Sequence, residues 1–322
     1  MTAALTGLAQ ETIDPDEAEV TSAFIAFLKD ASRRRNPTGP VKRFNQGRGA
    51  GCVEAEFEVP DHLPAALRVG LFAQPRTFRA HIRFANASSA TDRDKDVRGM
   101  AIALFDVPGV NLTADSSRQD FVLNSHPVMV ARDSKQFLEL LQAMEQGGLA
   151  RLAFFARHPA LARIGLAAQQ HHTCHLDIPY WSTTPFLFGA GRAVKYVVKP
   201  CSGRTSPMPA ELSDTYLTDA FRTHLAEAEA CFDFMVQFQI DSVRTPIEDA
   251  TTEWDEADAP YVAVAKIRIP PQRVDDPERA EACERFSFNP WHCLSDHRPL
   301  GNLNRARRDI YRELSQFRDA TS

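Results

Sequence analysis

Residues 302–322 read NLNRARRDIYRELSQFRDATS, and this C-terminal stretch decides the fold assignment. Arg307 lies four positions before Tyr311, and Arg318 lies seven positions after it. Because an α-helix has about 3.6 residues per turn, these spacings predict that the three side chains share one helix face. A neighbouring guanidinium favours the phenolate form of a tyrosine, and a phenolate is an anionic ligand for ferric iron. The stretch therefore predicts a helix that can present a tyrosinate to iron.

The same residues also fit an ordinary amphipathic C-terminal helix. Ile310, Leu314 and Phe317 would form its buried side, and the arginines would be solvated. The choice between the two interpretations depends on residues that lie upstream.

Composition indicates an ordinary globular protein. The chain has 322 residues, of which 43% are hydrophobic and 25% are charged, and we expect one domain over residues 1–322. Within it, residues 1–40 would form an N-terminal helix and arm, and residues 302–322 the C-terminal helix. The formal net charge of -5 argues against a nucleic-acid partner.

The sequence also predicts a cytoplasmic location. The N-terminus lacks the basic and apolar segments of a secretory signal, and no apolar run approaches the roughly 20 residues that span a bilayer. The six cysteines show no CxxC spacing, which favours reduced thiols over a disulfide framework or a zinc site. A homodimer is left open.

Hydrophobic periodicity predicts an α+β fold with a mainly antiparallel sheet, because strands and helices are segregated along the chain. Strands are expected over 53–59, 79–84, 97–107, 121–130, 195–199, 232–240 and 261–269. Helices are expected over 14–35, 134–147, 149–170 with a break at Pro159, 209–229 and the C-terminal stretch. The glycines at 47, 49 and 51 indicate a bulge or a close backbone approach.

Four motifs in order resemble those of haem catalases. They are RFNQGRGAG (43–51), the pair HIRFANASS (81–89) and DVRGMAIALF (96–105), PVMVARD (127–133), and RxxxY from Arg307 to Tyr311 with Arg318 seven residues later. The segment FNPWHCLSDHRPLGNLNRARRDIY (288–311) resembles short catalase-related proteins that lack the accessory domains of full catalases. The resemblance covers nearly the whole chain.

The resemblance implies a catalase-like core, an antiparallel β-barrel with helices packed around it, that binds haem b. Tyr311 would be the axial iron ligand and Arg307 its hydrogen-bonding partner. The haem propionates would be held by Arg43, Arg83 and Arg318, and Phe137 would lie near the distal face. The chain would then be a haem-dependent oxidoreductase acting on a small-molecule substrate, namely a peroxide, an organic hydroperoxide or another small organic compound.

Three positions on the distal side depart from the catalase pattern. Gln46 stands where the family has its distal histidine, and Ala85 stands where it has a supporting serine. Ser125 falls at the distal asparagine, although Asn124 is adjacent. A glutamine amide cannot take up a proton, whereas general acid–base catalysis contributes about 10²–10⁴ in rate. We therefore expect a poor hydrogen peroxide dismutase.

Two histidines are candidates to replace the distal base. His126 lies beside Ser125, and His81 shares a strand face with Arg83. The alternative for both is an ordinary hydrogen-bonded histidine of the pocket or core.

Other sites and functions stay open. His171 and His175 would share a helix face and form a candidate metal site, and Cys293 is a candidate thiolate ligand for haem. The alternative functions are a haem-dependent lyase, isomerase or dehydratase of the allene-oxide-synthase type, and a non-catalytic haem-binding protein.

Overall fold

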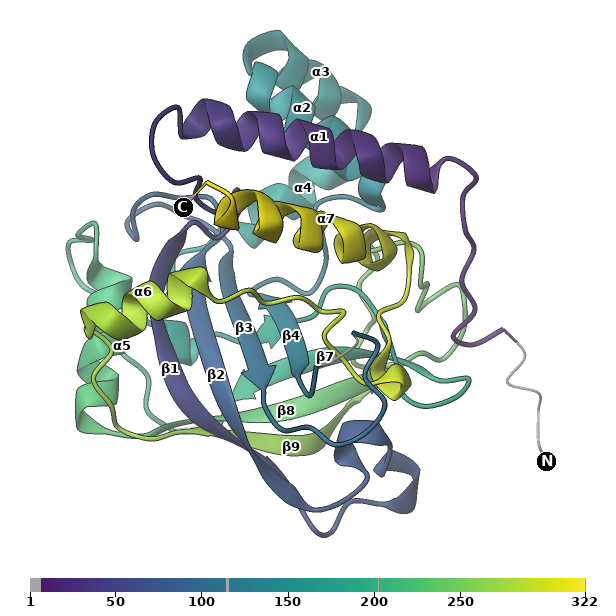
Figure 1. The fold of residues 1–322 in the computed structure, drawn as a ribbon, viewed down its shortest axis with the longest axis vertical. Coiled ribbons are helices and arrows are strands. Elements are labelled where there is room, and N and C mark those ends of the chain that lie inside the picture. The colour runs from purple at the N-terminus through teal and green to yellow at the C-terminus, as the bar shows by residue number, and fades with distance from the viewer. Residues whose placement is uncertain (1–6, 114–115, 202, 322) are drawn as a thin grey trace.

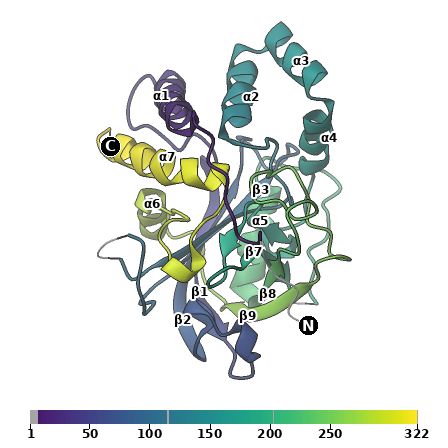
Figure 2. The same cartoon turned by 90° about the vertical axis from the view of Figure 1, so that its right-hand side faces the viewer.

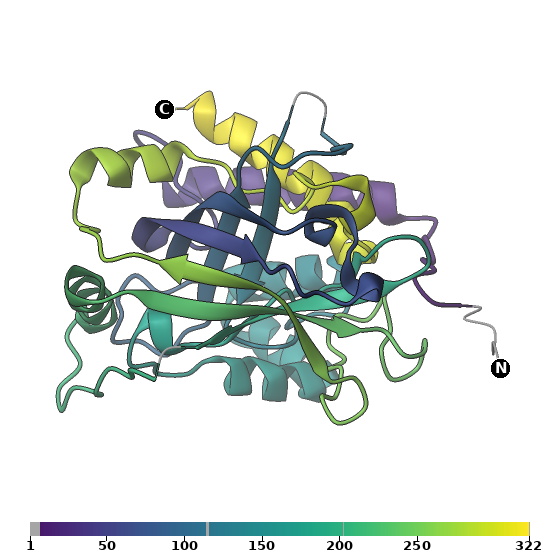
Figure 3. The same ribbon diagram turned by 90° about the horizontal axis from the view of Figure 1, so that it is seen from below.

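The computed structural model describes residues 7–113, 116–201 and 203–321. Within these residues, eight strands close into an antiparallel β-barrel, in the order β5-β4-β3-β2-β1-β9-β8-β7 with a β5–β7 pairing that closes the ring (Figures 1 and 3). A further strand, β6, pairs only with β7. The strands are β1 (Arg48–Val59), β2 (Arg76–Asn86), β3 (Arg98–Leu104), β4 (Gln119–Asn124), β5 (Tyr180–Trp181), β6 (Phe186–Leu187), β7 (Ala193–Pro200), β8 (Ala230–Phe238) and β9 (Tyr261–Ile269).

Helices cover one end and one side of the barrel. In Figure 1, α1 and α7 run side by side over the end of the barrel, and Figure 2 shows α2, α3 and α4 as a separate layer. In the described part of the chain, none of the helices is both long and apolar enough to span a bilayer. The α-helices are α1 (Glu17–Arg35), α2 (Ser134–Gln146), α3 (Gly148–Arg157), α4 (Pro159–Ala168), α5 (Tyr216–Glu227), α6 (Pro277–Arg285) and α7 (Asn302–Asp319).

Phenylalanine rings fill the barrel. Phe57 of β1, Phe121 of β4 and Phe234 of β8 are buried, and their ring centroids lie 4.8–6.3 Å apart. Burial of each such side chain stabilises the fold by about 1.5–3 kcal/mol. In β1 the predicted alternation is confirmed, because Val53, Ala55, Phe57 and Val59 are buried.

Most of the predicted elements are confirmed, with shifted ends. A register shift between Gly49 and Gly51 confirms the predicted bulge, and the predicted break at Pro159 separates α3 from α4. The strand predicted over 121–130 is wrong beyond Asn124. Helix α6 and the two-residue strands β5 and β6 were not predicted.

Four cysteines correct the expectation of reduced thiols. Cys52 is bonded to Cys283, with their Cα atoms 6.1 Å apart, and Cys201 is bonded to Cys231, with their Cα atoms 5.3 Å apart. Disulfide geometry depends on spatial approach and not on sequence spacing, so the absence of CxxC motifs did not exclude these pairs.

An ion-pair cluster at the start of α7 joins three distant segments. The Arg305 guanidinium contacts the carboxylates of Glu11, Glu17 and Glu248, and the Arg305 side chain is only 16% exposed. The cluster links the N-terminal arm and α1 to α7, and so positions the helix that carries Tyr311.

Replacing Arg305 with methionine is expected to lower the free energy of unfolding by about 2–3 kcal/mol, because three carboxylates lose their shared cation. Burial alone would raise the pKa of Glu11, but hydrogen bonds from the Gly301 N–H, Arg298 and Arg305 lower it below its usual 4.5. This stabilisation is present above pH 4.5 and is lost as the pH falls through the lowered pKa. Urea unfolding should therefore show a difference between variant and wild type that shrinks below pH 4.5. Arg308→Met, at an exposed arginine of the same helix, serves as the control.

Candidate functional site

A cavity of about 490 Å³ lies among α1, α2, α4, α7 and the adjoining ends of the barrel strands. Its lining has a phenol on α7, a group of arginines, a polar wall from the strand ends, and an apolar region from the helices. All of the residues predicted to bind haem line it, as do Gln46, Asn124 and His126 of the predicted distal side, whereas Ser125 does not.

Helix α7 supplies the phenol. The Arg307 Nη2 donates a hydrogen bond of 3.0 Å to the Tyr311 hydroxyl oxygen, as the four-residue spacing predicts. The guanidinium is itself held by the Asn304 side-chain oxygen at 3.2 Å. Asn304 is fully buried, and its amide nitrogen donates to the carbonyls of Pro185 and Leu300. Asn304 thus orients Arg307, and Arg307 in turn orients the phenol.

Three arginines from distant segments gather at the cavity. Arg43 precedes β1, Arg83 lies on β2 and Arg318 lies on α7, and all three line the cavity. Burial and the positive charge of Arg83 lower the pKa of Arg43 to about 9, although the nearby Glu284 carboxylate opposes that shift. Burial likewise lowers the pKa of Arg318. Such a group of buried and partly buried cations is stabilised by an anion, because uncompensated buried charge is costly.

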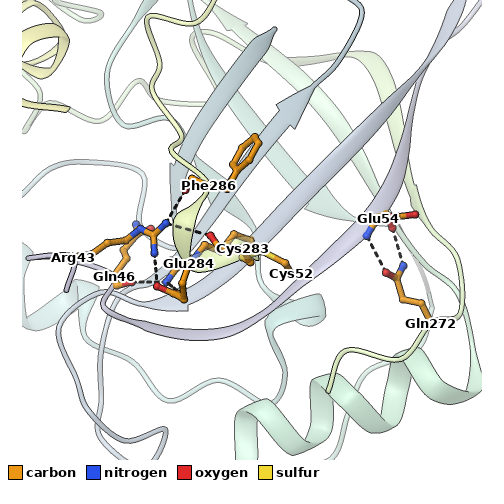
Figure 4. The surroundings of a disulfide bond; sticks show 9 residues. Arg43, Gln46, Cys52, Glu54, Gln272, Cys283, Glu284 and Phe286 are labelled. Atoms are coloured by element: carbon orange, nitrogen blue, oxygen red, sulfur yellow. Dashed lines mark hydrogen bonds and ion pairs between the residues drawn. A yellow bond between two sulfur atoms is a disulfide. The ribbon is translucent and has the colours of Figure 1, made fainter. Parts of the chain in front are cut away.

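Glu284 is an anion that meets two of these arginines. Its carboxylate contacts the guanidinium group of Arg43 (Figure 4). It also contacts that of Arg83, and the Arg83 pair is 3.0 Å long. The Arg83 side chain is 2% exposed, whereas that of Glu284 is 50% exposed. The carboxylate therefore reaches a buried cationic site from the protein surface.

Gln46 and Asn124 form the polar wall. The Gln46 Nε2 lies 3.5 Å from the Asn124 side-chain oxygen. Gln46 has a positive φ of 57°, and its backbone is held by a 2.7 Å hydrogen bond to the Ala87 carbonyl. A Cβ atom at Gly99 would overlap the Gln46 amide, so the glycine makes room for this side chain.

The structure separates the two candidates for the distal asparagine. Asn124 lines the cavity together with Val122, as alternation along β4 requires. The Ser125 hydroxyl instead accepts a 2.9 Å hydrogen bond from the Arg98 N–H. Ala85 is buried on β2 and does not line the cavity.

His126 and Phe137 also line the cavity. Burial lowers the pKa of His126, so its imidazole is neutral at pH 7. The ring of Phe137 packs edge-to-face on Phe24 of α1, with centroids 5.7 Å apart. Phe137 thus joins α2 to the helices that form the wall around Tyr311.

The other sequence candidates lie elsewhere. The His81 ring packs against Phe105 and Phe286, outside the cavity lining. Cys293 is fully buried outside the lining, and burial raises the pKa of its thiol. Because α4 ends at Ala168, His171 and His175 do not share a helix, and the described residues hold no group of three metal ligands.

The residues present fit haem on the chemistry of their donors. Tyr311 offers an oxygen ligand, the three arginines offer charge for two carboxylates, and the helices offer apolar surface for a macrocycle. Glu284 and Asn304 were missed from the sequence. Asn304 precedes Arg307 by three positions, and this spacing could have predicted that the two side chains are neighbours on the helix.

Comparisons with known proteins support the fold. No protein-family model and no curated protein sequence matches the chain. Its structure resembles a bacterial catalase with a TM-score of 0.67 and 17% identity, over 91% of this chain and 60% of the catalase. It resembles a fungal catalase with a TM-score of 0.69 and 16% identity, over 90% of this chain and 62% of that one. The chain thus spans about 60% of the length of these enzymes, and the predicted catalase-like α+β fold is confirmed.

Proposed function

We propose that the chain is a haem b enzyme with a tyrosinate ligand that acts on an organic hydroperoxide and is a poor hydrogen peroxide dismutase. The observation that carries the proposal is the Tyr311–Arg307 hydrogen bond in a cavity that also holds Gln46, Asn124 and three arginines. Haem held through the Tyr311 oxygen would supply ferric chemistry suited to peroxide substrates.

The chain's own residues have separate roles in this proposal. Arg307 donates a hydrogen bond to the Tyr311 oxygen and so orients it toward the cavity's cofactor. The Gln46 amide and Asn124 bind a substrate oxygen by hydrogen bonds without transferring a proton. His126, neutral at pH 7, is the one lining histidine of the described residues and the remaining candidate to accept a proton.

The apolar side of the cavity favours an organic substrate over hydrogen peroxide. Leu140, Leu141 and Met144 of α2 and Leu161 of α4 line it. Met144 is also 46% exposed, so the lining continues to the surface beside α2. Hydrogen peroxide has no apolar surface to bury there, whereas the apolar substituent of an organic substrate gains about 25 cal/mol of binding free energy per Å² that it buries.

Gly165 of α4 offers a test of this side of the cavity. Gly165 lines the cavity, and a Cβ atom there would meet no atom within 4 Å. Gly165→Leu should fold at least as well, since glycine costs about 1 kcal/mol in a helix. We expect it to lower kcat/KM for cumene hydroperoxide roughly tenfold and to leave turnover of hydrogen peroxide unchanged. Gly165→Ala is the control, and equal losses for both substrates would contradict the assignment.

Product analysis tests the reaction type. Haem-loaded protein is incubated with an organic hydroperoxide, with and without a reducing co-substrate. Oxidation of the co-substrate supports the peroxidase-like reaction, whereas consumption of the hydroperoxide without it supports a lyase, isomerase or dehydratase. Gln46 favours this second reaction type, a lyase, isomerase or dehydratase reaction, because an amide orients a substrate without proton transfer. Tight haem binding with no turnover would instead indicate a non-catalytic haem-binding protein.

A further inference from the structure

The C-terminal end of α6 contacts two of the three arginines assigned to the proposed cofactor, Arg43 and Arg83. Arg43 Nη2 donates to the carbonyls of Phe286 at 2.7 Å and Cys283 at 3.3 Å, while Arg43 Nη1 meets the Glu284 carboxylate (Figure 4). A cation at a helix C-terminus is stabilised by the unpaired carbonyls there. Both terminal nitrogens of Arg43 are therefore engaged by α6 and the residue that follows it.

Helix α6 is attached to β1 at two points, which Figure 4 also shows. Before the helix, the Gln272 side chain exchanges hydrogen bonds with the Glu54 backbone, at 2.9 Å to its N–H and 2.7 Å to its carbonyl. At the other end, the disulfide joins Cys283 to Cys52. Cys283 directly precedes Glu284, so the covalent bond fixes the residue beside the competing carboxylate.

A ligand carboxylate could displace Glu284 from its ion pairs with Arg43 and Arg83. The carboxylate is half exposed, so water screens its pairs with the two arginines more than it would screen a fully buried pair. A ligand carboxylate that entered the cavity would meet the same guanidinium groups in a drier setting, where charged hydrogen bonds are stronger.

We infer that Glu284 is an internal anion that competes with the haem propionates for Arg43 and Arg83, and that the Cys52–Cys283 disulfide holds it there. This inference rests on the proposed haem site. Reduction by a dithiol would transfer two electrons and two protons to the Cys52–Cys283 bond, giving two thiols and oxidising the dithiol to its disulfide. The C-terminal end of α6, which carries Glu284, then moves away from Arg43 and Arg83 more readily, while Gln272 holds the segment before the helix on β1. The cell's thiol state would thereby set haem loading.

Glu284→Gln tests the competition. We expect the oxidised variant to bind haem roughly tenfold more tightly than wild type, measured by absorbance titration, because the neutral amide pairs weakly with arginine. Glu281→Gln is the matched control, since Glu281 lies on the same helix and pairs with Arg285. Haem dimethyl ester, which lacks the propionate charges, should bind both proteins equally. An unchanged haem affinity, or an equal gain for the ester, would overturn the inference.

The disulfide is tested by combining reduction with substitution. Dithiothreitol should raise the haem association rate of wild type, but not that of Cys52→Ser/Cys283→Ser or of Glu284→Gln. A response in the double cysteine variant would assign the effect to Cys201–Cys231 and refute the mechanism. A response in Glu284→Gln would show that the disulfide does not act through this carboxylate. Failure of wild type to bind haem at all would refute the proposed function itself, and so is distinguishable from both outcomes.

Discussion

Replacing Tyr311 with phenylalanine is expected to lower the affinity for ferric haem by more than about a hundredfold and to abolish the high-spin ferric absorption spectrum. Loss of an outer partner of a metal ligand already costs about 10–100-fold in metal affinity, so loss of the ligand should cost more. The phenylalanine ring keeps the packing of Tyr311 against the apolar cluster that α1, α2 and α7 form. The variant thus removes the oxygen and little else.

Two measurements separate this effect from misfolding. Tyr311 is half buried and Arg307 is its hydrogen-bond donor, so Tyr311→Phe should change the free energy of unfolding of the haem-free protein by about 1 kcal/mol or less. Tyr261→Phe, which removes a half-buried hydroxyl on β9, should retain both the spectrum and the affinity. A spectrum that survives in Tyr311→Phe would refute the axial assignment and, with it, the proposed function.

The residues around the cavity could be predicted because their spacing carries geometric information. Four and seven positions along a helix return to the same face, and Arg307, Tyr311 and Arg318 indeed line one cavity. Arg43 and Arg83 could be placed only by resemblance, because the pairing of β1 with β2 is a long-range contact that local pattern does not encode.

The errors in the predicted secondary structure have physical causes that are visible in the structure. Val128–Val130 are apolar because they line the cavity, which gave residues 125–130 the appearance of a strand. Helix α6 was missed since prolines precede it and its sequence, PERAEACER, has no apolar face, although Asp276 caps it and Pro277 begins it. Missing α6 also concealed Glu284, so the competing anion could not be predicted.

Gln46→His should convert the protein toward hydrogen peroxide dismutation, with turnover of haem-loaded protein rising about 10²–10⁴-fold. Position 46 has a left-handed φ of 57°, a region in which histidine is enriched among non-glycine residues. The side chain at 46 already lies over Gly99 and near Asn124, so under the proposed function an imidazole there would meet the substrate oxygen in place of the amide.

The pH profile identifies the new group. An imidazole accepts a proton only when neutral, so turnover of Gln46→His should rise with pH through about 6.5, whereas a glutamine gives no such titration. His126→Asn in the same background is the control, because His126 lines the same cavity and is already neutral at pH 7. If His126→Asn lowers the activity of Gln46→His, and returning residue 46 to glutamine does not, His126 is the proton acceptor.

If Gln46→His binds haem normally but gains no turnover, the missing distal base is not what limits peroxide dismutation in this chain. Ala85→Ser, which adds the serine that the catalase resemblance predicts at this position, is then the next substitution to test, because an unoriented imidazole transfers protons poorly.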